Sequence, residues 1–122
     1  ENWMRYALFA TALMNLGGAM MFVPAFTSLR TLLALPDPHP FCLWTLAIWI
    51  GVFGVYYFWM AVSQRRDRLF VATAAVGKLS FFGLLVAYSI VGDVPILAAI
   101  SGLPDLIFGA IFVAWLLLTT DD

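Results

Sequence analysis

Residues 69–91 read LFVATAAVGKLSFFGLLVAYSIV, an apolar run of membrane-spanning length with one lysine, Lys78, near its centre. The next run, residues 95–118, reads PILAAISGLPDLIFGAIFVAWLLL and carries Asp105 at a similar depth. A charge at the centre of a bilayer costs about 2.5–3.5 kcal/mol on insertion scales, so such groups are retained where they find partners. The two runs therefore predict a polar contact between two membrane helices.

The whole chain shares this apolar character. Of its 122 residues, 64% are hydrophobic and 11% are charged, with a mean hydropathy of +0.99, whereas a soluble domain has about 25% charged residues. Too little polar surface remains to cover a globule in water, which predicts an integral membrane protein. The net charge of -1 argues against a nucleic-acid partner. With one cysteine, Cys42, and one histidine, His39, we expect no disulfide, metal centre or cofactor.

Two further apolar runs, residues 4–23 and 41–62, complete a set of four, each long enough to cross about 30 Å of hydrocarbon as a helix. Only helices and closed barrels satisfy the backbone in lipid, and no alternating strand pattern is present. We therefore predict an all-α bundle of four transmembrane helices, forming a single membrane domain over residues 1–122. Pro24 should end the first span, and residues 25–34 predict a short interfacial helix with Arg30 on its polar side.

The short loop at residues 63–68, SQRRDR, holds three arginines out of the six Lys and Arg residues of the chain. By the positive-inside rule this loop is cytoplasmic, and four spans then place both termini on the cytoplasmic side. Tryptophan and tyrosine gather at membrane boundaries. We expect four aromatic residues near the cytoplasmic boundary: Trp3, Tyr6, Trp59 and Trp115.

Three polar residues inside the spans lie at similar depths. At a rise of 1.5 Å per residue, Asn15, Lys78 and Asp105 each lie about 15 Å from one edge of their span. The tight turn at Gly92 and Asp93 makes the last two spans antiparallel neighbours, so Lys78 and Asp105 should fall at one level. If the first span packs alongside, Asn15 joins them in a mid-membrane polar pocket.

The surroundings of Asp105 suggest which face looks inward. Small residues lie one turn away on either side of it: Ser101, Gly102 and Gly109. Small residues allow helices to approach closely in membranes, and Ser101 is also a candidate ligand-binding residue. Pro104 cannot donate to the carbonyl of Ile100, so the helix should kink there and leave that carbonyl free.

The second span offers Tyr57 as a further candidate, although the residue equally suits an interface or packing role. Gly51 and Gly54, about two turns and one turn before Tyr57, predict close helix packing. Their spacing says nothing about ligands.

Several functions remain open on these residues. The first is binding or translocation of a small polar or amphipathic ligand, or of a proton, by Asn15, Lys78 and Asp105. For this function we expect a homo-oligomer, because a chain this small needs one to form a pathway. In the second the Lys78–Asp105 pair is purely structural, and the chain is an accessory subunit of a larger membrane complex. The third, and least supported, is an intramembrane enzyme acting on a lipid or quinone, with Asp105 and Lys78 or Tyr57 as acid and base.

The order of these residues along the chain resembles that of a known group of proteins. The asparagine of the first span, the proline-rich turn, the glycine–lysine pair at residues 77–78 and the Asp-Leu-Ile at residues 105–107 resemble a group of small bacterial four-span membrane proteins, DoxX-like in architecture. The resemblance covers nearly the whole chain and implies a four-helix bundle in the bacterial inner membrane. It implies Asn15, Lys78 and Asp105 as the polar positions, without a settled activity. The group has an asparagine before this aspartate where the chain has Pro104, so the local helix geometry departs from the pattern.

Overall fold

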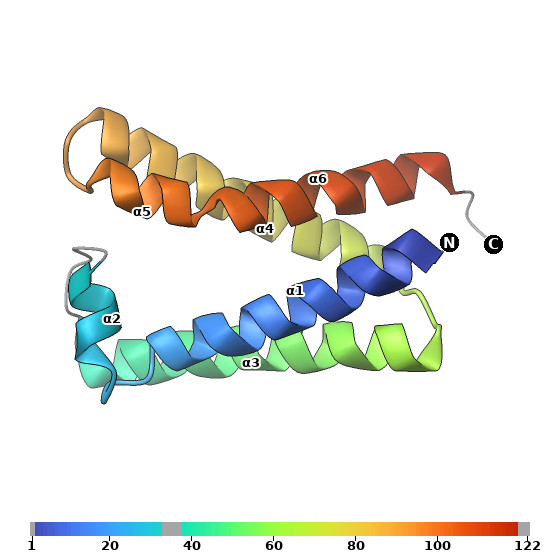
Figure 1. Cartoon of the computed structure of the whole chain (residues 1–122), viewed down its shortest axis with the longest axis horizontal. Helices are drawn as coiled ribbons and strands as arrows, with labels where there is room; N and C mark the ends of the chain where they lie inside the picture. The colour runs from blue at the N-terminus through green and yellow to red at the C-terminus, as the bar shows by residue number, and fades with distance from the viewer. Residues whose placement is uncertain (1, 33–37, 120–122) are drawn as a thin grey trace. The chain divides into compact units, whose positions relative to one another are not determined.

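The computed structural model describes residues 2–32 and 38–119, and within this part of the chain it contains helices and turns but no strand (Figure 1). The chain divides into two compact units, Glu1–Arg65 and Arg66–Asp122. The first unit contains α1 (Asn2–Met21), α2 (Thr27–Leu32) and α3 (Pro40–Ser63). The second contains α4 (Arg68–Ile90), α5 (Ile96–Ser101) and α6 (Leu103–Leu118).

Three helical segments are long and apolar enough to cross a membrane: α3, α4 and the combined α5–α6 segment, Ile96–Leu118. They match the predicted spans 41–62, 69–91 and 95–118 to within one residue at each end. The predicted first span, 4–23, corresponds to α1, which is helical but does not reach the same apolarity. Arg5 and Asn15 lower its mean hydropathy.

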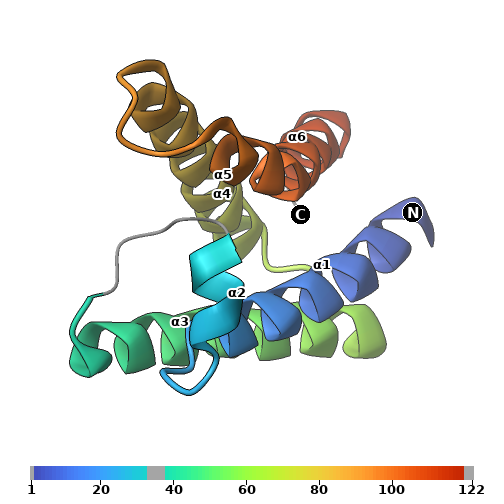
Figure 2. The same ribbon diagram turned by 60° about the vertical axis from the view of Figure 1, so that its left-hand side comes forward.

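In the first unit, α1 and α3 run antiparallel and lie side by side (Figures 1 and 2). They pack closely at Gly54 of α3, where an added Cβ would lie 3.1 Å from the Cβ of Asn15 and 3.4 Å from the carbonyl oxygen of Ala12. One turn earlier, a Cβ on Gly51 would lie 3.8 Å from that of Ala19. The predicted close packing at this glycine pair is confirmed.

The first unit also shows that the predicted position of Arg30 is wrong. This arginine, expected on the polar face of the interfacial helix, is 3% exposed. Its guanidinium donates to the carbonyls of Met21, Val23 and Pro24 at 3.2, 3.0 and 3.3 Å. The last carbonyls of a helix have no partner within the helix, and Arg30 of α2 supplies donors where α1 ends. Residues 33 and 34 of the predicted helix lie outside the described residues.

In the second unit, α4 runs antiparallel to the α5–α6 segment (Figure 1). The predicted tight turn is confirmed, with Gly92 at φ 88°. This left-handed conformation favours glycine. At the other end of α4, the carboxylate of Asp67 accepts from the backbone N–H of Phe70 at 3.1 Å and caps the first turn.

Hydrogen bonds join the C-terminal end of α6 to Arg68, the first residue of α4. Arg68 donates to the hydroxyl of Thr119 at 2.6 Å and to the carbonyl of Leu116 at 2.9 Å. Its guanidinium also lies 5.4 Å from the ring centroid of Trp115, within cation–π range. Trp115, one of the four aromatic residues expected near the cytoplasmic boundary, is 3% exposed and packs inside the second unit beneath the Arg68 guanidinium.

Candidate functional site

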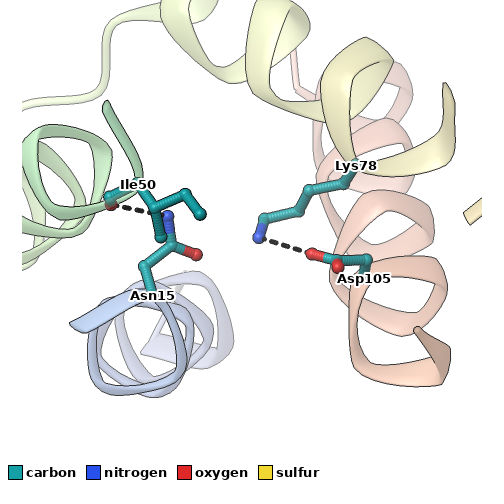
Figure 3. Close-up of polar contacts among 4 residues, drawn as sticks. All are labelled: Asn15, Ile50, Lys78 and Asp105. Carbon is teal, nitrogen blue, oxygen red and sulfur yellow. Dashed lines mark hydrogen bonds and ion pairs between the residues drawn. The ribbon is translucent and has the colours of Figure 1, made fainter. Parts of the chain in front are cut away.

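The structure brings together the two charged residues that lie within apolar helices. The Nζ of Lys78 on α4 donates to Oδ1 of Asp105 on α6 at 3.1 Å (Figure 3). The Lys78 side chain is 7% exposed and that of Asp105 is 21% exposed. The predicted contact between the last two spans is thereby confirmed. Counting the rise per residue from the turn was sufficient because the tight turn at Gly92 makes α4 and the α5–α6 segment antiparallel neighbours.

Two glycines hold α6 close enough to α4 for this contact. A Cβ on Gly109 would lie 2.8 Å from the Cγ and Cδ2 atoms of Leu79 and 3.6 Å from the Cβ of Lys78. A Cβ on Gly102 would lie 2.7 Å from Cδ1 of Leu85. Both glycines are buried, and with Asp105 they form one face of the segment at spacings of three and four residues. Of the three small residues predicted to mark the inward face, Gly102 and Gly109 pack against α4, and Ser101 is exposed.

The predicted interruption of the last span is also present, between α5 and α6 at Gly102. The N–H of Gly102 donates to the carbonyl of Ala99, and the N–H of Asp105 donates to the carbonyl of Gly102, both at 3.0 Å and three residues apart. The carbonyl of Ile100 is not left free, because a backbone N–H at this junction donates to it. The expected free acceptor beside Asp105 was therefore wrong, since the chain tightens into 3₁₀-type bonds around Pro104.

Ser101 does not belong to the ion-pair site. Its side chain is exposed, and its hydroxyl donates to the carbonyl of Ala98 at 2.6 Å, within α5. Serine commonly bonds back to a carbonyl in the preceding turn. Ser101 lies one turn before Asp105 in the chain, but its hydroxyl bonds within its own helix.

The two oxygens of the Asp105 carboxylate differ in their surroundings. Oδ1 accepts from the Lys78 ammonium, and Figure 3 shows the second oxygen, Oδ2, turned aside from Nζ. Among the residues that the structure describes, none donates a hydrogen bond to Oδ2. An ionised carboxylate can accept several hydrogen bonds. Asp105 therefore keeps acceptor capacity within an otherwise apolar helix pair.

The other two candidates, Asn15 and Tyr57, belong to the first unit. The Nδ2 of Asn15 donates to the carbonyl of Ile50 on α3 at 3.1 Å (Figure 3), which ties α1 to α3. Tyr57 is 1% exposed, and its ring centroid lies 6.3 Å from that of Phe53 in an edge-to-face arrangement. The grouping of Asn15 with the ion pair stays a prediction.

A separate apolar groove of about 770 Å³ lies in the first unit. Leu16 of α1 and residues of α3 between Ala47 and Trp59 line it. None of the five predicted site residues lines this groove, so it is distinct from the ion-pair site.

The described residues include no group of three or more His, Cys, Asp and Glu side chains that could hold a metal ion. Cys42 is a free, exposed thiol. His39 accepts from the N–H of Phe41 at 3.0 Å and caps α3.

Sequence reasoning did not identify Arg30 and Arg68 as residues that close helix ends. Each lies in or beside a short connection, where a basic residue suggests a solvent-exposed charge. Their positions after Pro24 and at the start of α4 were the available signals, since cations favour helix C-termini.

Comparison with known proteins leaves the chain without an assigned relative: no family model, no curated protein and no solved structure matches it.

Proposed function

We propose that this chain is a four-span membrane protein in which Lys78 and Asp105 form a binding site for a small polar or amphipathic ligand or a proton. The observation that carries the proposal is the 3.1 Å ion pair between helices of membrane-spanning length, with one Asp105 oxygen still able to accept. A buried ion pair is often no more stable than an apolar contact of the same volume. Its presence at this depth therefore favours a functional role.

The fourth span in this proposal is α1. It has 20 residues, which at 1.5 Å per residue extends over about 30 Å, and it packs antiparallel to the longer α3. The arginines of the loop at residues 63–68 favour a cytoplasmic loop and cytoplasmic termini. The resemblance to small DoxX-like bacterial proteins would place the bundle in the bacterial inner membrane.

A second candidate function is that of an accessory subunit in a larger membrane complex. The exposed tryptophans of α3 favour it: Trp44, Trp49 and Trp59 are 51%, 60% and 49% exposed. Aromatic residues are enriched at protein interfaces, although they equally suit lipid headgroups. In this function the ion pair only fixes the register of α4 and α6.

The experiment that tests the binding function compares the wild type with the double variant Lys78→Met/Asp105→Leu, which removes both charges and leaves apolar side chains. Three probes with one apolar body are tested by thermal shift on the purified protein: 2-phenylethylammonium, 3-phenylpropanoate and 2-phenylethanol. Proton flux into proteoliposomes is measured in parallel. We expect at least one probe, or the proton flux, to respond in the wild type and not in the folded double variant.

The opposite result would assign the pair a structural role. It consists of a double variant that folds as well as the wild type while both proteins show the same probe shifts and the same proton flux. Stoichiometric co-purification of another membrane protein with both would then support the accessory-subunit function.

A further inference from the structure

The unused oxygen of Asp105 indicates which class of ligand the site accepts. We propose that Asp105 Oδ2 receives an organic ammonium ion with an apolar body, and that this cation enters in exchange for one proton from Lys78. The inference rests on the proposed binding function and narrows it to a cation–proton exchange site.

Access to the two charged groups is unequal, and this favours a cation over an anion. An anion would have to reach the Lys78 ammonium, whose side chain is 7% exposed. The Asp105 side chain is 21% exposed, and a cation that bonds to Oδ2 leaves the Oδ1 contact with Lys78 in place. Hydrogen bonds to an ionised acceptor are about twice as strong as neutral ones, so an ammonium N–H is a better partner than a hydroxyl.

The walls of the site favour an organic cation over a metal ion. Hard metal ions such as calcium take about six to eight oxygen ligands. Apart from the Cβ of Lys78, the side chains nearest to Gly102 and Gly109, one turn on either side of Asp105, are those of Leu79, Phe82 and Leu85, which carry no oxygen. An alkylammonium needs few acceptors, and its body can contact these apolar groups.

Charge balance sets the stoichiometry of the exchange. The Lys78 ammonium and the Asp105 carboxylate sum to zero, so a bound cation would leave one net positive charge inside apolar surroundings, which is costly. Loss of one proton from Lys78 restores neutrality, and the resulting amine still donates an N–H to Oδ1. The proton leaves as the ammonium ion enters, so one charge replaces another.

No other titratable side chain in the described part of the second unit is placed to supply this proton. The remaining ones lie in the loops or near the helix ends, at least about 15 Å along a helix from Lys78 or Asp105. They are Arg66, Asp67, Arg68, Tyr88 and Asp93.

The test is isothermal titration of the purified full chain with 2-phenylethylammonium, in two buffers of equal pH and different protonation enthalpy. We expect the difference in heat to correspond to about one proton released per cation bound. The methylated analogue, (2-phenylethyl)trimethylammonium, has the same charge without N–H donors and should bind about tenfold more weakly.

Variants distinguish binding at Asp105 from partitioning of the probe into the detergent micelle. Asp105→Asn should weaken binding by about tenfold or more, and the matched control Asp93→Asn, an identical change at the exposed turn, should leave it unaltered. If the unpaired lysine prevents Asp105→Asn from folding, Lys78→Gln/Asp105→Asn replaces it with a neutral hydrogen-bonding pair.

Three results would overturn the inference: equal binding of the methylated cation, binding without proton release, or tighter binding of 3-phenylpropanoate than of the amine. If 3-phenylpropanoate binds and the double variant loses it, the ligand class is wrong while the binding function stands. If no probe binds and no proton flux depends on the pair, both fail together.

Discussion

The two helix pairs of this chain solve the same packing problem with different polar chemistry. In the α1–α3 pair, Gly54 lets α3 approach α1, and the amide of Asn15 donates to the carbonyl of Ile50. In the α4–α6 pair, Gly109 lets α6 approach α4, and the polar contact joins the ammonium of Lys78 to a carboxylate. The first contact is a neutral hydrogen bond to the backbone, and the second can gain or lose a proton.

The difference shows what packing alone requires. A neutral amide that bonds to a main-chain carbonyl is sufficient to join two apolar helices. Membrane helices also associate through small residues and van der Waals contact. Helix packing therefore does not require the ion pair of the second unit. For this reason the ion pair is the place to look for function. The following predictions test the contrast, from the largest expected effect to the smallest.

Removing one charge of the ion pair should have the largest effect. Asp105→Leu leaves the Lys78 ammonium unpaired and should lower the free energy of unfolding by about 3 kcal/mol or more, measured by denaturation in mixed micelles. The double variant Lys78→Met/Asp105→Leu should recover most of this loss. An Asp105→Leu protein as stable as the wild type would show that the pair is not desolvated.

Removing the buried guanidinium of the first unit should come next. Arg30→Met removes the guanidinium donors from the carbonyls of Met21, Val23 and Pro24, of which Val23 keeps the backbone N–H of Phe26. It should lower the unfolding free energy by about 2 kcal/mol. Arg68→Met should cost less, about 1 kcal/mol, because Arg68 is only half-buried. If Arg68→Met lowers the unfolding free energy more than Arg30→Met in the same assay, the hydrogen bonds at the end of α6 contribute more to stability than those at the end of α1.

Filling the glycine contacts tests whether both pairs are equally tight. Gly109→Ala places a Cβ 2.8 Å from Leu79 and should lower the unfolding free energy by about 2 kcal/mol, and Gly54→Ala by about 1 kcal/mol. Gly77→Ala is the matched control, since nothing lies within 4 Å of its added Cβ. Thermal unfolding of the three variants measures the order, and equal Tm values would remove the packing argument.

The neutral contact should matter least. Asn15→Leu removes the hydrogen bond to the carbonyl of Ile50 and should lower the unfolding free energy by about 0.6 kcal/mol, a typical value for hydrogen bonds between membrane helices. A loss as large as that of Asp105→Leu in the same assay would abolish the proposed difference between the two helix pairs.

The sequence predicted the features that depend on local pattern. Hydropathy placed α3, α4 and the α5–α6 segment, because a continuous apolar run longer than the bilayer thickness has few alternatives to a helix. The Lys78–Asp105 contact followed from equal depth on two helices joined by a tight turn. The interruption near Pro104 followed from the missing N–H of proline.

The sequence did not reveal contacts that depend on where a helix end meets another segment. The direction of the Arg30 side chain depends on the path of the chain between α1 and α2, and no local pattern encodes that path. The partners of Ser101 and Trp115, which are the carbonyl of Ala98 and the guanidinium of Arg68, depend on the local geometry of the helix ends. Depth can be counted along a chain, whereas orientation around a helix at a junction cannot.

The junction at Gly102 divides the Ile96–Leu118 segment into two helices, α5 and α6. Spectra of oriented bilayers should then report one tilt angle for Ile96–Ser101 and another for Leu103–Leu118. In a thicker bilayer we expect α5 and α6 to become more nearly collinear. A segment shorter than the hydrocarbon layer either lengthens in this way or thins the lipid around it. Asp105 lies in the first turn of α6, so a change in the angle between the two helices would change the position of its carboxylate.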